Sequence, residues 1–156
     1  MHSDLDTRLL GAWLLQRWQI AYPGRVTAVL PFGADASGLL VYVAAPDSER
    51  SSTYLGWMSA TMSRAQRTPL ANAAHGEYLT YGGRWWVEGQ RVHHQVLWSM
   101  NPQLLGTVQL RDASFVDEQL QLTAFEVDPS NPSRGRTHLI KWRRAHGERL
   151  SVRESQ

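Results

Sequence analysis

The clearest alternation of hydrophobic and polar positions in this chain lies between Tyr78 and Arg111. Turn-forming residues interrupt the alternation twice, at Glu88-Gly89-Gln90 and between Met100 and Leu105. Alternation with a period of two is typical of strands that bury one face. This stretch therefore predicts three successive antiparallel strands joined by two short connections.

Parity predicts which side chains share a face, because successive residues of a strand point in opposite directions. The three sets expected to face the interior are Tyr81, Gly83, Trp85 and Val87; Val92, His94, Val96 and Trp98; and Thr107, Gln109 and Arg111. A plain core would be lined by leucine and valine. Rings combined with titratable and hydrogen-bonding groups instead predict a wall that contacts a ligand.

The rest of the chain continues the pattern. Asp4 or Asp6 can cap a short helical turn before Gly11. Further strands are expected at residues 12–20, 26–30, 39–44, 54–62, 120–127 and 136–145, with a turn at Asp117-Glu118. Residues 63–76 lack alternation and predict a connection with a short helix around residues 69–74, placed to act as a lid.

Eight to nine short strands at hairpin spacing predict an all-β protein. Closure into a single antiparallel barrel would leave no unpaired edge, and a barrel of about eight strands can hold one small molecule. The 156 residues correspond to a single domain with its core at about residues 9–145.

Composition argues against several classes of function. The formal charge is +2, and basic residues are interspersed with acidic ones, so there is no continuous basic stripe for nucleic acid. We find no run of about eighteen apolar residues, which a membrane helix needs, and no secretory signal, so a cytoplasmic protein is expected. Seven tryptophans are a large aromatic load for this length.

Several short motifs follow one another through the chain. They are Leu9-x-Gly11-x-Trp13-x-Leu15, Pro31-Phe32-Gly33-x-Asp35-x-x-Gly38-x-Leu40-x-Tyr42, Gly56-Trp57-Met58-Ser59-Ala60, Tyr81-x-Gly83-x-Trp85-x-Val87 and Leu139-x-x-Trp142-x-Arg144. Their order resembles the lipocalin-like domain family of bacterial and fungal proteins. The resemblance implies a calycin-type barrel with an internal cavity. It also implies that Trp13 lies at the closed end under the guanidinium of Arg144 or Arg143.

His94 is the first candidate for chemistry, because its parity places it among apolar neighbours. Desolvation there would lower the pKa of the imidazole and leave it neutral, able to accept a proton or to hydrogen-bond a ligand. The alternative is a core histidine bonded to a neighbouring strand. A register shift of one residue would exchange the roles of His93 and His94.

Tyr81 and Arg111 complete the predicted catalytic set. A phenol can donate a hydrogen bond to a carbonyl as negative charge develops there, and a guanidinium fork can bind a carboxylate or an enolate. The alternatives are packing for the phenol and a structural ion pair for the guanidinium. Residues predicted to bind substrate are Tyr42, Trp57, Trp85, Val96, Trp98, Gln109 and His138. His138 and Glu126 could face the cavity mouth, with the surface as the alternative.

No metal or cofactor is predicted. Neighbouring strand residues point to opposite faces, so His93 and His94 cannot ligate one ion, and no third ligand has zinc spacing. The sequence has neither a glycine-rich phosphate loop after a strand nor a Gly-x-Ser-x-Gly elbow.

Three functions remain open. The first is a cofactor-independent cyclase or isomerase that binds a hydrophobic, polyketide-like biosynthetic intermediate and promotes its rearrangement, cyclisation or hydration. The resemblance implies a similar range, since related barrels include such enzymes and small-ligand binders. The second is a non-catalytic carrier of a small hydrophobic ligand. The third is a barrel packed solid with rings that serves as an interaction module. A homodimer is also left open.

Overall fold

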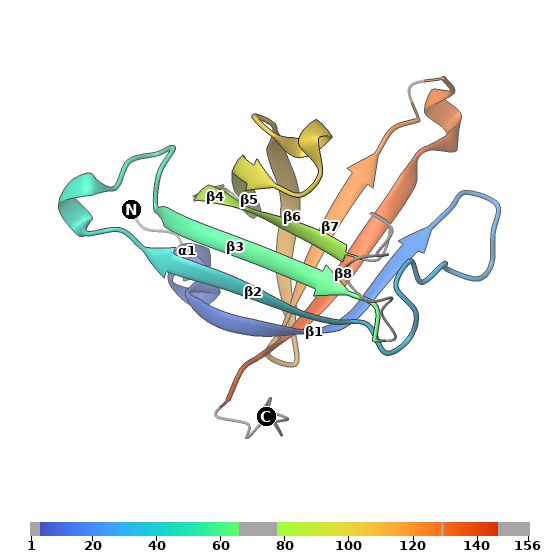
Figure 1. The fold of residues 1–156 in the computed structure, drawn as a ribbon, viewed down its shortest axis with the longest axis horizontal. Coiled ribbons are helices and arrows are strands. Elements are labelled where there is room, and N and C mark those ends of the chain that lie inside the picture. The colour runs from blue at the N-terminus through green and yellow to red at the C-terminus, as the bar shows by residue number, and fades with distance from the viewer. Residues whose placement is uncertain (1–3, 66–77, 129, 147–156) are drawn as a thin grey trace, which may run out of the picture.

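The computed structural model describes residues 4–65, 78–128 and 130–146. In this part of the chain eight antiparallel strands close into one barrel in sequence order, and a short helix packs at one end (Figure 1). The prediction of an all-β antiparallel barrel with an N-terminal helical turn is confirmed. The helix expected around residues 69–74 lies outside the described residues, as do His75 and Glu77, which flank that segment.

The helix α1 spans Asp4–Leu9. The strands are β1 (Gly11–Ala21), β2 (Ser37–Ala44), β3 (Gly56–Ser63), β4 (Tyr78–Glu88), β5 (Arg91–Ser99), β6 (Val108–Val116), β7 (Gln119–Glu126) and β8 (Arg136–Arg144). Connections contain 3-10 helices at Asp47–Glu49, Pro102–Leu104 and Pro132–Arg134. A search of the described residues finds no helix with the length and apolar character needed to cross a membrane.

The strand predictions hold with one exception. Residues 26–30 form no strand, and only an isolated bridge joins Val29 to Ile20. Val26 is fully exposed, so this segment buries too little apolar surface to hold a ladder. The turn between β6 and β7 is confirmed. Asp117 and Glu118 both have positive φ, 51° and 64°, as expected in a two-residue hairpin turn.

The N-terminal helix is tied to the barrel through carbonyl groups that a helix end leaves without partners. The indole nitrogen of Trp13 donates to the carbonyl oxygen of Leu9 at 2.9 Å. Arg144 places its guanidinium 4.0 Å from the centre of the Trp13 ring. The same guanidinium donates to the carbonyl oxygens of Arg8 and Leu10, both at 2.8 Å. The expected contact of Trp13 with an arginine of the last strand is therefore confirmed, with Arg144 as its partner.

Bulges change the parity of two strands. The ladder between β4 and β5 pairs Gly82 with Trp98 and Gly83 with Val96, so Leu97 is an extra residue. Side chains of β5 before Leu97 point to the predicted side of the sheet. Side chains after Leu97 point to the opposite side. A second register shift lies in β1 between residues 15 and 17, and beyond it Trp18 points inward.

Two predicted wall residues, Trp57 and Trp98, lie on the outer face of the barrel. Their side chains are 41% and 53% exposed, and their rings stack on each other with centroids 6.1 Å apart. The bulge at Leu97 turns Trp98 outward. Trp57 alternates with the buried residues Met58 and Ala60 and so faces away from them. The prediction that these two rings face the interior is wrong.

Candidate functional site

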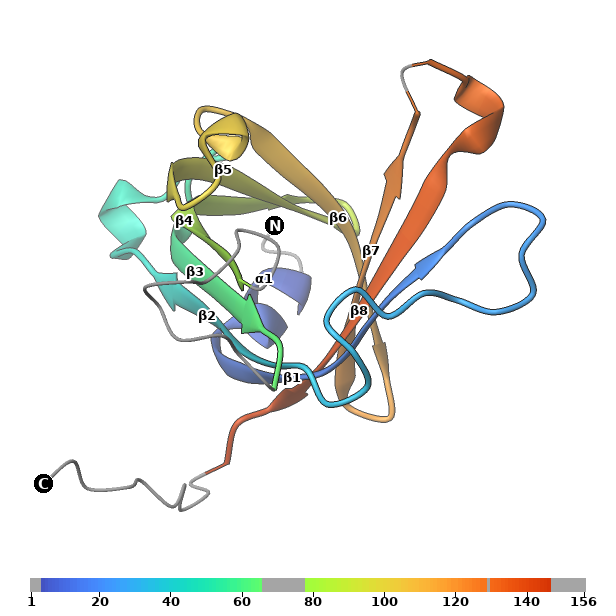
Figure 2. The ribbon, with the colours of Figure 1, turned by 45° about the vertical axis from the view of Figure 1, so that its right-hand side comes forward.

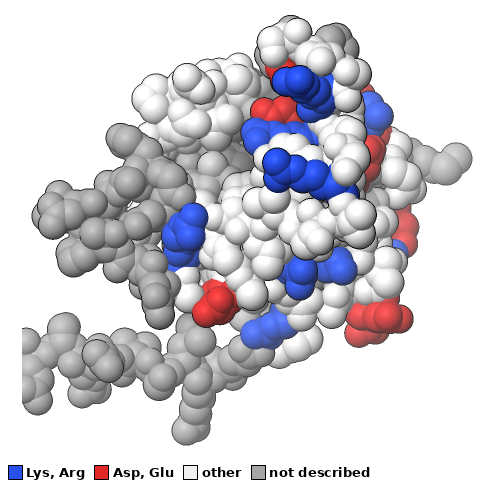
Figure 3. Space-filling view, turned by 90° about the vertical axis from the view of Figure 1, so that its right-hand side faces the viewer, with Lys and Arg blue, Asp and Glu red and all other residues white. Residues whose placement is uncertain are grey.

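The two ends of the barrel interior are packed differently. Near α1 the interior is filled by large side chains, among them Trp13, Trp85 and Trp142, which are almost completely buried. The opposite end, where β1 ends and β2 begins, contains a cavity of about 760 Å³ and is called the open end below. Figure 3 views the molecule from the side of the open end and shows basic and acidic side chains interspersed among uncharged ones. A cavity of this size can accept a small molecule, which makes the open end a candidate binding site.

This cavity extends to the seam between β6 and β7. The ladder of these strands begins at the pair Asp112 and Thr123, so among the described residues 108–111 and 124–126 do not pair with each other. Beyond this point the β7–β8 hairpin diverges from β6 (Figure 2). The cavity is lined here by the exposed residues Val108, Leu110 and Phe125. The seam therefore has an apolar border.

A hydrogen-bonded chain of three side chains runs from the packed interior to the cavity. Strand β5 supplies His94 at its centre, and β2 and β4 supply a tyrosine on either side. The hydroxyl of Tyr42 lies 2.7 Å from Nε2 of His94, and that of Tyr81 lies 2.9 Å from Nδ1. His94 is only 1% exposed and does not line the open-end cavity, whereas Tyr81 does. The imidazole therefore does not line the cavity and is linked to it through its hydrogen bond with Tyr81.

The hydrogen bonds of this chain also assign the tautomer of His94. Tyr42 is buried, and in the described structure its hydroxyl has no other hydrogen-bond partner. Its proton must then go to Nε2, because a buried hydroxyl hydrogen without an acceptor is costly. The imidazole proton is consequently on Nδ1 and is donated to the Tyr81 oxygen. This arrangement leaves the hydroxyl hydrogen of Tyr81 free to point into the cavity.

Burial keeps all three groups uncharged. It lowers the pKa of His94 from 6.5 to about 3, and the nearby side chains of Arg111 and His93 act in the same direction. Burial also raises the pKa of Tyr81 and, more strongly, that of Tyr42 above the ordinary value of 10.0, while the Arg111 charge opposes both rises. At neutral pH the imidazole and the two phenols are therefore uncharged hydrogen-bonding groups, and the imidazole is not a base exposed to substrate.

Arg111 supplies a cation to the same cavity from β6. Its guanidinium donates to the carbonyl oxygen of Leu110 at 2.8 Å and to the side-chain oxygen of Gln109 at 3.5 Å. Gln109 in turn donates to the hydroxyl of Thr107 at 2.8 Å. The alternative of a structural ion pair is not realised for Arg111 among the described residues, whose salt bridges do not include it.

A second polar group at the open end consists of residues that bond one another. The carboxylate of Glu126 accepts from Arg136 at 2.7 Å and lies 2.9 Å from Nε2 of His138. The indole of Trp18 donates to Nδ1 of His138 at 3.2 Å, so the His138 proton is on Nε2 and points to Glu126. Burial lowers the pKa of His138, and the hydrogen bond from Arg136 lowers that of Glu126. This group is thus a neutral imidazole beside a compensated carboxylate.

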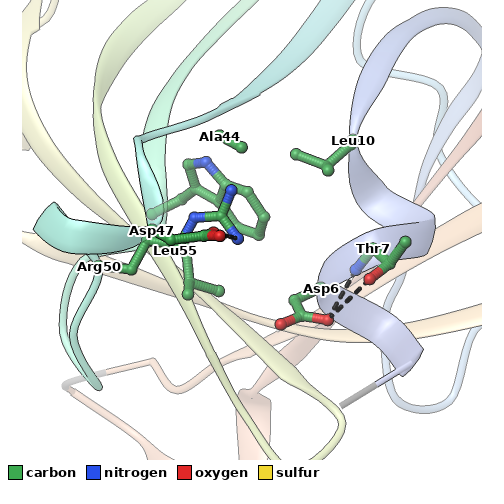
Figure 4. Close-up of a pocket in the computed structure, with 8 residues that line it drawn as sticks. Asp6, Thr7, Leu10, Ala44, Asp47, Arg50 and Leu55 are labelled. Carbon is green, nitrogen blue, oxygen red and sulfur yellow. Dashed lines mark hydrogen bonds and ion pairs between the residues drawn. The ribbon is translucent and has the colours of Figure 1, made fainter. Parts of the chain in front are cut away.

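A smaller cavity of about 300 Å³ lies at the helix end of the barrel. Figure 4 shows Asp6 and Thr7 of α1 on one side of it and Arg50 and Asp47 on the other. These groups already have partners, since Arg50 and Asp47 form an ion pair at 2.9 Å and Asp6 accepts from the backbone nitrogen of Thr7 at 2.7 Å. Trp85 lines this cavity and not the open-end one. We therefore take the open-end cavity as the candidate site.

The predicted site residues divide into four groups in the structure. Those that line the open-end cavity are Tyr81, Gln109, Arg111 and His138. Those buried behind its wall are Tyr42, His94 and Val96. Trp85 lies toward the helix end, where its indole donates to the carbonyl oxygen of Val43 at 3.1 Å. Trp57 and Trp98 are outside. The expectation that His94, rather than His93, belongs to the interior agrees with its burial.

Sequence reasoning did not select several residues of the cavity wall. Trp18 and Phe32 pack edge to face with centroids 4.9 Å apart, and Met62 and Ile140 add apolar surface. The sequence carries a signal for Trp18, because the polar pair at residues 16 and 17 interrupts the alternation just before it, where the register of β1 shifts. Phe32 lies in a turn-rich segment, where alternation says nothing about facing.

The described residues include no group of three or more histidine, aspartate or glutamate side chains placed to hold a metal ion. A family model described as lipocalin-like domain matches residues 10–145. No curated protein and no solved structure matches the chain. The match covers most of the sequence and agrees with the closed eight-stranded barrel, and the cavity suits the binding of a small molecule. The chain belongs to the lipocalin-like domain family.

Proposed function

We propose that this protein is a cofactor-independent enzyme of the cyclase or isomerase type. It binds a hydrophobic biosynthetic intermediate in the open-end cavity and promotes its rearrangement, cyclisation or hydration. The observation that carries the proposal is the chain of Tyr42, His94 and Tyr81, which places a buried, oriented phenol at the wall of a largely apolar cavity.

Tyr81 is the group that would touch substrate. Its hydroxyl donates a hydrogen bond to a carbonyl oxygen of the bound molecule, and this bond strengthens as negative charge develops on that oxygen. His94 is a positioning residue, since its Nδ1 proton bonds the Tyr81 oxygen and fixes the direction of the phenol. One such donor is worth about 100- to 1,000-fold in rate. The shape of the cavity supplies the rest by holding the substrate in a reactive conformer.

Mass spectrometry after incubation with a small-molecule extract of the source organism tests this proposal. The wild type should convert at least one compound into a product of the same mass and different retention, or of the mass expected for added water. Tyr81→Phe should slow this conversion about 100-fold. The matched control is Tyr54→Phe, which removes a phenol that packs on Trp57 outside the barrel. Conversion at the wild-type rate by Tyr81→Phe would refute the proposal.

A carrier is the second candidate function. The observation that favours it is that the histidine is walled off from the cavity and held neutral, as a purely structural group would be. A carrier should release its bound compound unchanged on denaturation, and Tyr81→Phe should change only the affinity. The same mass-spectrometric experiment separates the two functions.

A further inference from the structure

We propose that the ligand is an apolar molecule with a single anionic oxygen group, a carboxylate or an enolate, and that Arg111 binds this group while Tyr81 donates a second hydrogen bond. The inference rests on the proposed function only in using the same cavity. It adds the charge and the chemical class of the molecule that the cavity accepts.

The charge balance of the cavity wall favours an anionic ligand. Glu126 is engaged by Arg136 and His138, so this carboxylate is already compensated. The acidic neighbour of Arg111 in the sequence, Asp112, pairs instead with Arg91 at 3.0 Å. Among the described residues of the wall, Arg111 is therefore a cation without an acidic partner. An anionic ligand would supply the missing charge.

Arg111 also has hydrogen-bond donors left for a ligand. A guanidinium has five N–H donors in a planar fork that matches a carboxylate. Arg111 uses two of them, one on its own preceding carbonyl and one on Gln109 at the limiting distance of 3.5 Å. Neither bond is to a charged acceptor, so both can be exchanged for a stronger one. The free hydroxyl hydrogen of Tyr81 adds a donor on the same wall.

Arg111 and the hydrogen-bonded chain of Tyr42, His94 and Tyr81 share one electrostatic environment. The charge of Arg111 acts on the pKa of Tyr42, Tyr81 and His94. Tyr81 and Arg111 both line the open-end cavity, so this cation and the end of the hydrogen-bonded chain share one wall. The surrounding wall is apolar, with Trp18, Met62 and Ile140, so charge interactions there are screened less than in water. An apolar body with one anionic group fits this wall better than a molecule carrying several charges.

Decanoate and decanol test the inference, because they share an alkyl chain and differ in charge. Binding is followed by tryptophan fluorescence, to which Trp18 in the cavity wall contributes, and is checked by calorimetry. Wild type should bind decanoate at least about tenfold more tightly than decanol, since hydrogen bonds to a charged group are stronger than those to a neutral one. Arg111→Met should remove this preference. The control is Arg84→Met, which deletes a cation from the outer face near Trp57.

Tyr81→Phe should weaken decanoate binding by a smaller factor, about three- to tenfold. Arg111→Lys keeps the charge without the fork and should retain part of the preference, which also guards against a misfolded methionine variant. Equal affinities in wild type, no binding of decanoate, or a preference retained by Arg111→Met would each overturn the inference. These experiments measure binding and not turnover. Loss of the decanoate preference would refute this inference even where turnover depends on Tyr81. Absence of turnover would refute the proposed enzyme and leave a measured decanoate preference standing.

Discussion

Replacing His94 by glutamine should remove a large part of the acid sensitivity of this fold. Burial holds the pKa of His94 at about 3, against 6.5 for an ordinary imidazole. Between these values the unfolded chain binds a proton at this residue and the folded chain does not, so folding becomes less favourable as the pH falls. The contribution of neutral His94 is complete above pH 6.5 and is lost toward pH 3. Each pH unit in this window costs about 1.4 kcal/mol, or about 3 kcal/mol over two units.

Urea unfolding followed by tryptophan fluorescence, repeated between neutral pH and about pH 4.5, measures this effect. The free energy of unfolding of the wild type should fall about 3 kcal/mol more than that of His94→Gln. Val96→Ala is the matched control, because it removes buried volume beside His94 and should cost the same at every pH. Parallel curves for wild type and His94→Gln would refute the reasoning. Nitrogen NMR of the wild type offers an independent check. The shifts of His94 should remain those of a neutral ring protonated at Nδ1 down to about pH 4.

Three further substitutions test the packing around the site. Tyr42→Phe leaves Nε2 of His94 buried without a donor and should lower the free energy of urea unfolding by about 1–3 kcal/mol. Gly83→Ala places a methyl group against the carbonyl oxygen of Gln95 and should cost about 1–3 kcal/mol in the same assay, and an unchanged midpoint would contradict that contact. Arg144→Met removes a cation–π contact and two hydrogen bonds to carbonyl groups at the helix end, and should cost about 1–3 kcal/mol. Faster amide exchange in α1 would locate the Arg144 effect.

Local patterns were sufficient to predict the strands and much of the site. Alternation identifies the strands because each buries one face, and it placed Tyr81, His94 and Arg111 correctly on inner faces. Facing depends on register, however, and one extra residue reverses it. Leu97 is such a residue, and it lies in the apolar run Val96-Leu97-Trp98, where alternation no longer fixes which side chain faces inward. This is why alternation alone predicts the wrong face for Trp98.

Hydrogen bonds between side chains of distant strands could not be predicted from the sequence. His94 bonds Tyr42, which lies 52 positions away, and Trp18 bonds His138, which lies 120 positions away. No local spacing encodes these pairs, since they depend on how eight strands close. The sequence could offer Tyr42 and His94 as separate candidates. It could not indicate that they form one unit, nor that Tyr81 stands between the imidazole and the cavity.

Packing at the helix end of the barrel holds in place the phenol that borders the cavity at the open end. Tyr42 stands against the buried ring of Trp85, with centroids 4.9 Å apart, so it cannot move without opening the packed interior. It fixes His94, which fixes Tyr81 at the border of the cavity. A phenol held in this way needs no reorganisation when a ligand arrives, and preorganised donors contribute most to binding and to rate. Enlarging the packed end with Trp85→Ala should therefore weaken the site from a distance, even though Trp85 does not line the open-end cavity.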